Sequence, residues 1–115
     1  SNPLKEIDVM ELYLPFSTCG VVWMDFMHMC GPGEAPKLIR KGVFDMDGEL
    51  PINPSGGVLS TNPIGATGLI RIAEAALQVM GRAGERQVSD VKTAMATAFG
   101  SCYWFEASIL RSTKP

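Results

Sequence analysis

The sequence has no long hydrophobic run, no cluster of lysine and arginine, and a single histidine. Because a bilayer-spanning helix needs about 20 consecutive apolar residues, we expect no membrane span, and we likewise expect no secretory signal. A net charge of −2 without a basic patch argues against a nucleic-acid partner. Neither the dinucleotide pattern G-x-G-x-x-G nor the nucleotide P-loop pattern is present, so the sequence supports no nucleotide cofactor.

Cysteine is also scarce. The three cysteines, Cys19, Cys30 and Cys102, are an odd number and lack the C-x-x-C spacing that is typical of zinc sites and redox pairs. We therefore expect free thiols, no metal site, and a reducing compartment such as the cytoplasm.

The residues that are present indicate one globular domain. The 115 residues include 46% hydrophobic and 19% charged side chains, and we expect a single domain over residues 1–115. Residues 6–14 begin with alternating acidic and apolar side chains and predict a strand that ends at Pro15, with Asp8 and Glu11 facing solvent or a loop. Residues 18–29 are apolar nearly all round, which predicts a helix buried on more than one side and ended by Gly31-Pro32-Gly33.

The second half of the chain alternates between helix and strand patterns. Residues 34–48 indicate an irregular excursion or a short helix, and residues 69–80 carry the clearest helical periodicity. Residues 82–89 indicate a polar loop, and residues 92–98 and 103–110 predict two strands. This order favours an α/β layer over a sandwich or a bundle. The apolar stripe of the periodic helix consists of Leu69, Ile72, Ala73, Ala76 and Met80.

A glycine-rich stretch, INPSGGVLSTNPIGATG at residues 52–68, runs directly into that helix. Gly56 and Gly57 permit a positive φ or a backbone approach that a Cβ would block, while Pro63 and Gly65 lead into the helix start. The plainer interpretation is tight packing of strand against helix. In the alternative, these four residues bind a ligand, because the free N–H groups of a helix start can hold an anion or a carbonyl oxygen.

Three separated motifs resemble one family. NPSGG followed by NPIGATG is similar to N-x-S-G-G … G-H-P-x-G-A-T-G in the C-terminal domain of thiolases. EIDVMELYLPFS at residues 6–17 resembles D-I-D-V-x-E-[LI]-[HY]-D-x-F-[ST] of sterol-carrier-protein-type thiolases, also called non-specific lipid-transfer proteins, and GERQV at residues 84–88 resembles their G-x-R-Q-V connection. The resemblance implies an α/β fold: a thiolase-like C-terminal half, with helices packed on a mixed sheet.

The resemblance also implies a chemistry that this chain does not reproduce. Complete thiolases have two halves and act on acyl-CoA: a cysteine of the N-terminal half takes the acyl group, the G-H-P histidine activates it, and a second cysteine handles the proton. Here the histidine position falls on Asn62, the second cysteine position falls on Ala98, and the nucleophile half is not within these residues. An amide cannot accept a proton near neutral pH, so we expect no thiolase activity from the isolated chain.

Tyr13, Asn62 and Cys102 are the candidate catalytic residues that remain. Tyr13 falls at the Asn, His or Tyr position of an earlier family motif, and some thiolase-like retro-aldolases of steroid side-chain breakdown use tyrosines for acid–base work. Cys102 lies past the family's cysteine position and replaces it only if the loop shifts. The plainer interpretations are a packing role for Tyr13, an inert small residue at Cys102 and a satisfied or partly exposed helix residue at His28.

Three functions therefore stay open: an acyl-CoA-related domain without thiolase activity of its own, one half of a split acyltransferase or retro-aldolase, and a self-association domain. The implied substrate is a coenzyme A thioester, with no covalently bound cofactor. Thiolase halves pack helix on helix, so a lone half is expected to expose the apolar faces of residues 18–29 and 69–80. We accordingly expect a homo-oligomer or a thiolase N-terminal-half partner, and the open sheet edge makes self-pairing plausible.

Overall fold

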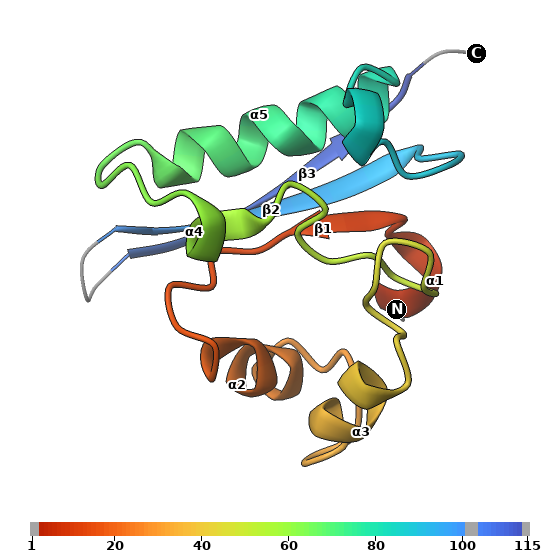
Figure 1. The fold of residues 1–115 in the computed structure, drawn as a ribbon, viewed down its shortest axis with the longest axis vertical. Helices are drawn as coiled ribbons and strands as arrows, with labels where there is room; N and C mark the ends of the chain where they lie inside the picture. Colours follow the sequence, from red (N-terminus) through yellow and green to blue (C-terminus); the bar gives the residue numbers. More distant parts are fainter. Residues whose placement is uncertain (1–2, 101–103, 114–115) are drawn as a thin grey trace.

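The computed structural model describes residues 3–100 and 104–113. In the described residues, a central sheet lies between α5 on one face and α2 and α3 on the other (Figure 1). The elements in chain order are α1 (Pro3–Glu6), β1 (Val9–Glu11), α2 (Cys19–Phe26), α3 (Ala35–Arg40), α4 (Gly57–Ser60), α5 (Thr67–Met80), the 3-10 helix η1 (Gly84–Arg86), β2 (Thr93–Gly100) and β3 (Trp104–Arg111).

The sheet has three strands in the order β1-β2-β3. β1 runs parallel to β2, with Val9 opposite Ala94, and β3 runs antiparallel to β2, with Phe105 opposite Phe99. On the free side of β1, Ile52 forms an isolated parallel bridge with Met10. The predicted α/β fold with helices packed on a mixed sheet is confirmed.

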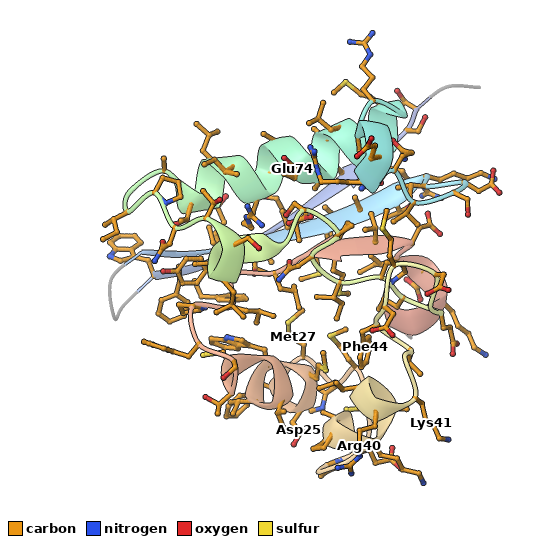
Figure 2. All side chains as sticks on the ribbon, viewed as in Figure 1. Asp25, Met27, Arg40, Lys41, Phe44 and Glu74 are labelled. Carbon is orange, nitrogen blue, oxygen red and sulfur yellow. The ribbon has the colours of Figure 1, made fainter. Side chains whose placement is uncertain are left out.

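Each face of the sheet carries its own hydrophobic core. Val9 packs with Ala75, Ala94 and Ala96 beneath α5, whereas its neighbour Met10 packs on the opposite face. Figure 2 shows Met27 and Phe44 in the layer between the sheet and α2 and α3, with Arg40 and Lys41 on the outer side. The second core consists of Met10, Leu12, Met24, Met29, Ala35, Phe44 and Leu50.

The first strand is shorter than its sequence pattern predicts. Glu6 belongs to α1, so the expectation of a strand from residue 6 is wrong. The paired strand stops at Glu11, because side chains take the next backbone donors. The N–H of Leu12 donates to Asn53 Oδ1 at 2.6 Å, and that of Tyr13 donates to Thr97 Oγ1 at 2.8 Å.

The first long helix is less buried than expected. α2 ends at Phe26, shortly before His28, which adopts a left-handed φ of 53°. Gly20 and Met24 are the buried residues of α2, while Val22 and Phe26 are exposed, so the expectation of burial on more than one side is wrong. The physical reason is that α2 covers one face of the sheet from the outside of the described fold (Figure 1). The short-helix alternative for residues 34–48 is confirmed by α3.

The predicted helix at residues 69–80 is confirmed as α5, which ends at Gly81 with a φ of +69°. Its buried residues are Thr67, Arg71, Ala75 and Gln78, whereas Leu69 and Met80 of the apolar stripe are exposed. This confirms that α5 exposes an apolar face. In the described part of the chain, no helix is both long and apolar enough to cross a bilayer.

Candidate active site

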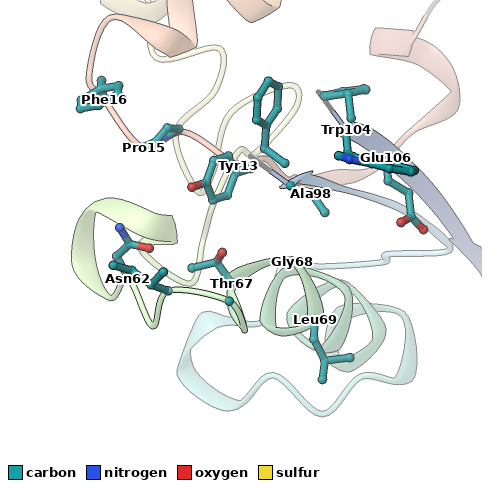
Figure 3. Close-up of a pocket in the computed structure, with 15 residues that line it drawn as sticks. Tyr13, Pro15, Phe16, Asn62, Thr67, Gly68, Leu69, Ala98, Trp104 and Glu106 are labelled. Atoms are coloured by element: carbon teal, nitrogen blue, oxygen red, sulfur yellow. The ribbon is translucent and has the colours of Figure 1, made fainter. Parts of the chain in front are cut away.

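A cavity of about 970 Å³ lies where β1 leads into Tyr13, β2 reaches Gly100 and α5 begins. Asn62, Gly65 and Thr67 line it from the loop before α5 and from the first turn of that helix (Figure 3). The far wall is aromatic and consists of Phe99, Trp104 and Phe105. The cavity therefore gathers segments that are distant in the sequence, at the end of the sheet where both parallel strands finish.

Tyr13 is held at this cavity from two directions. Thr97 fixes its backbone N–H, and its ring stacks on Phe99 with 6.1 Å between the ring centroids and 8° between the planes. Asn53, which has a left-handed φ of 53°, fixes the preceding residue through its side-chain oxygen. In the described part of the chain the Tyr13 hydroxyl has no hydrogen-bond partner. The ring is thus positioned while its hydroxyl stays available to a ligand.

Asn62 and the start of α5 form the opposite wall. Figure 3 shows the Tyr13 hydroxyl pointing toward the end of the cavity at which the Asn62 side chain lies. Ala66 occupies the N-cap position of α5 and supplies no capping side chain, and Thr67, Gly68 and Leu69 of the first turn line the cavity. N–H groups of a first helical turn lack intrahelical acceptors, so this wall can receive a carbonyl or enolate oxygen.

The four predicted substrate-binding residues divide into two groups. Gly65 lines the cavity with a φ of +90°, and Pro63 lies between the lining residues Asn62 and Ile64. Gly56 and Gly57 lie outside the lining. They have φ values of +87° and +61°, and a Cβ on Gly57 would meet Asn53 Nδ2 at 2.7 Å. Packing and backbone conformation therefore account for this second pair.

Ala98, which the sequence resemblance aligns with the second cysteine of thiolases, has a small side chain. Ala98 lines the cavity, and a Cβ on Gly68 would lie 2.7 Å from the Ala98 Cβ. Small residues at both positions therefore let the first turn of α5 approach β2. Cys102, the third candidate, lies outside the described residues.

Sequence reasoning missed the aromatic wall. Trp23 joins it from α2, with centroid distances of 5.7 Å to Phe99 and 5.4 Å to Phe105. The sequence of β3 carried a signal for aromatic side chains at this end of the sheet. Trp104 and Phe105 are adjacent there and project to opposite faces of the strand. Tyr13 and Trp23 both contact Phe99, but only in the folded chain, so no local sequence pattern could predict these contacts.

A buried ionic cluster beneath the site was also missed. Glu11, expected to face solvent or a loop, is instead 0% exposed and pairs with Arg71, 3% exposed, at 2.7 Å. Ser55 Oγ donates to the Glu11 carboxylate at 2.7 Å and accepts from Arg71 Nη1 at 2.8 Å. Burial raises the pKa of the Glu11 carboxyl above its ordinary value, against the lowering effects of the Ser55 hydrogen bond and the Arg71 charge. The cluster links the three segments that lead to Tyr13, Asn62 and Thr67.

The other candidate nucleophiles lie away from the cavity. Cys30 Sγ lies 3.6 Å from Asp25 Oδ1; burial first, and then the hydrogen bond to Asp25, raise the pKa of this thiol. Cys19 is also a free thiol, and His28 is exposed beyond the end of α2. Within residues 3–100 and 104–113, no group of three His, Cys, Asp or Glu side chains is placed to hold a metal ion.

Comparison with known proteins places this geometry in a family. The sequence profile described as "Thiolase C-terminal domain-like" matches residues 3–113. Human "Sterol carrier protein 2" is 40% identical over 97 residues, which cover 84% of this chain and 18% of that protein. "Acetyl-CoA acetyltransferase" of Methanothermobacter thermautotrophicus is 34% identical over 96 residues, covering 83% of this chain and 25% of that protein. The chain thus spans a quarter or less of these two relatives.

A solved structure supports the same assignment. A chain of the "Ltp2-ChsH2(DUF35) aldolase" matches with a TM-score of 0.71 and 28% sequence identity, covering 86% of this chain and 25% of that one. Because the family profile matches residues 3–113, nearly the whole of this chain, the chain belongs to the thiolase C-terminal domain-like family.

Proposed function

We propose that this chain forms one wall of a coenzyme A thioester site in a thiolase-type carbon–carbon lyase, and that it has no thiolysis activity by itself. The observation that carries the proposal is the cavity: the Tyr13 hydroxyl is held at it, while Asn62 and Ala98 stand at the positions of the family's histidine and second cysteine. The aldolase name of the structural relative supports the same chemistry.

The proposed reaction is the retro-aldol cleavage of a β-hydroxyacyl thioester. A base supplied by the second half of the site takes the hydroxyl proton, the C–O bond becomes a carbonyl, the Cα–Cβ bond breaks, and its electron pair forms the thioester enolate. The enolate oxygen lies at the N-terminus of α5, and Tyr13 donates a proton to the enolate carbon. The products are an aldehyde or ketone and the shortened acyl-CoA, with no oxidant or reductant consumed.

A second half is required to close this site. Ile64 is 94% exposed and Leu69 is 72% exposed, and both belong to the cavity rim at the start of α5. Apolar side chains this exposed around a cavity are typical of an interface. We propose that an N-terminal thiolase half packs there, whether it is encoded with this chain or separately.

The experiment compares two reactions of the chain assembled with a thiolase N-terminal half, with co-elution confirming the complex. We expect release of a carbonyl compound from a β-hydroxyacyl-CoA and no thiolysis of a β-ketoacyl-CoA. Tyr13→Phe keeps the stacked ring and removes only the hydroxyl, and we expect it to lower the cleavage rate by about 100-fold or more. The matched control Phe16→Leu alters an exposed lining residue without an acid–base group. Thiolysis by the complex, or an unchanged rate in Tyr13→Phe, would refute the proposal.

A further inference from the structure

The last strand, β3, is the open edge of the described sheet. Two hydrogen bonds fix which of its backbone groups are free. Ser112 N donates to Lys92 O at 2.9 Å, and Asp8 N donates to Thr93 O at 2.9 Å, so even-numbered residues of β2 face β3 and odd-numbered ones face β1. Antiparallel pairing alternates in the same way, so Phe105, Ala107 and Ile109 direct their N–H and C=O groups away from the sheet.

This edge carries little of the usual protection. Natural edge strands carry lysines, prolines or bulges, or are covered by another segment. The β3 register runs without interruption from Trp104 opposite Gly100 to Arg111 opposite Thr93, and its charged residues are Glu106 and Arg111. Trp104 is 75% exposed and Ile109 is 59% exposed, on opposite faces of the strand. The edge therefore combines free backbone groups with apolar side chains.

We propose that β3 pairs antiparallel with β3 of a second copy of this chain, about a twofold axis at Ala107. In this register the free backbone groups of Phe105 meet those of the partner's Ile109, and Ala107 meets the partner's Ala107. On the face toward α5, Trp104 lies opposite the partner's Leu110. The Glu106 carboxylate lies opposite the hydroxyl of the partner's Ser108. The two sheets then continue as one.

The side-chain pattern of β3 favours a second copy of this chain as the partner strand, and it favours the register centred at Ala107. Centred at Ala107, the strand is complementary to itself: apolar side chains meet apolar ones on both faces, and the carboxylate meets a hydroxyl. Two adjacent registers also pair the free backbone groups. The one centred at Ser108 would place Arg111 against Phe105 and Glu106 against Leu110, and the one centred at Glu106 would place the two Glu106 carboxylates opposite each other. The next one, centred at Ile109, would place Phe105 against Thr113.

The pairing also extends the cavity wall. Trp104 and Phe105 line the cavity, and the partner's Leu110 and Ile109 would stand directly beside them. Each copy would then contribute apolar surface to the rim of the other copy's site. This inference uses the strand edge alone and does not depend on the proposed reaction.

The test is charge substitution at the twofold axis. Ala107 is exposed, so Ala107→Lys and Ala107→Glu each leave the fold intact, which circular dichroism checks, and each places like charges opposite one another in a dimer. Sedimentation velocity at micromolar concentration is expected to show a dimer for the wild-type chain and a monomer for each variant. The matched control Met46→Lys makes the same charge change at an exposed apolar residue outside the sheet and is expected to stay dimeric.

Mixing the two Ala107 variants locates the axis. Lysine from one copy then faces glutamate from the other, so we expect the mixture to sediment as a dimer at twice the monomer mass. A monomeric wild-type chain would overturn the proposal. Dimers that persist in both variants would place the interface on another face, and a mixture that stays monomeric would contradict the Ala107 axis.

Discussion

Replacing Arg71 with methionine is expected to destabilise the fold strongly at neutral pH, by an amount that depends on the state of Glu11. Arg71 Nη1 lies 2.7 Å from Glu11 Oε2, and both side chains are buried. Removing one member of a buried ion pair typically costs about 3–5 kcal/mol, because the other charge stays behind without a partner. We expect a loss of this size in the free energy of unfolding at pH 7.

The pH dependence follows from the Glu11 carboxyl. Its pKa is already raised by burial, and the Arg71 charge acts to lower it. In Arg71→Met the pKa in the folded state rises further, so the folded variant binds a proton that the unfolded chain releases. A raised carboxyl pKa contributes stability that is complete below the unfolded value and is lost as the pH rises through the folded value. The deficit of Arg71→Met relative to wild type should therefore shrink as the pH falls from 7 toward 5.

The double variant Glu11→Leu/Arg71→Met provides the matched control. Exchanging a whole buried pair for apolar side chains is often neutral or stabilising. Arg71 Nε is moreover buried without a hydrogen-bond partner in the described chain, a defect that the exchange removes. We expect the double variant to lie much closer to wild type than Arg71→Met does.

Urea denaturation followed by circular dichroism, at several values between pH 5 and 8, measures all three free energies of unfolding. Each unit of pKa difference corresponds to about 1.4 kcal/mol, which is well resolved by this method. An Arg71→Met variant within about 1 kcal/mol of wild type at pH 7 would refute the structural role of the pair. A deficit that does not change with pH would refute the assignment of its pH dependence to Glu11.

Three further changes test individual contacts, two beside the cavity and one at Cys30. Gly68→Ala places a Cβ 2.7 Å from the Ala98 Cβ and should cost about 1–3 kcal/mol by urea denaturation, with Ala98→Gly in the same chain restoring most of it; no loss would mean that α5 does not approach β2. Thr97→Val leaves the Tyr13 N–H without its acceptor and should cost about 1–3 kcal/mol, and equal stability would show that this hydrogen bond is dispensable. Asp25→Asn removes a group that raises the pKa of the Cys30 thiol, so alkylation of Cys30 by iodoacetamide at pH 8, followed by peptide mass spectrometry, should become faster; an unchanged rate would count against the contact.

Local patterns predicted most elements of the fold. The periodic segment at residues 69–80 and the two β-rich segments near the C-terminus correspond to α5, β2 and β3. The same periodicity did not reveal which face of α5 is buried. Its buried face carries Arg71 and Gln78, because each polar group finds a partner there: Arg71 binds Glu11, and Gln78 Oε1 accepts from Val88 N at 2.9 Å. Such pairings depend on segments that meet only in the folded chain.

The sequence likewise predicted only part of the candidate site. The glycine motif marked the loop and helix start that line the cavity, and the resemblance marked Tyr13 and Asn62. Nothing local indicated that Phe99 would stack on Tyr13, because Tyr13 follows β1 whereas Phe99 lies in β2, far along the chain. Glu11 was misplaced because a carboxylate is ordinarily solvated, and only the distant Arg71 and Ser55 make its burial tolerable.

The central claim is that the cavity between Tyr13 and the start of α5 binds a coenzyme A thioester. The most direct measurement is a titration of the isotope-labelled 115-residue chain with acetoacetyl-CoA, followed by amide NMR spectroscopy. We expect the largest shift changes at Tyr13, Gly65 and Gly68, and smaller ones in Tyr13→Phe. Shift changes confined to residues outside the cavity, or none at saturating thioester, would contradict the account.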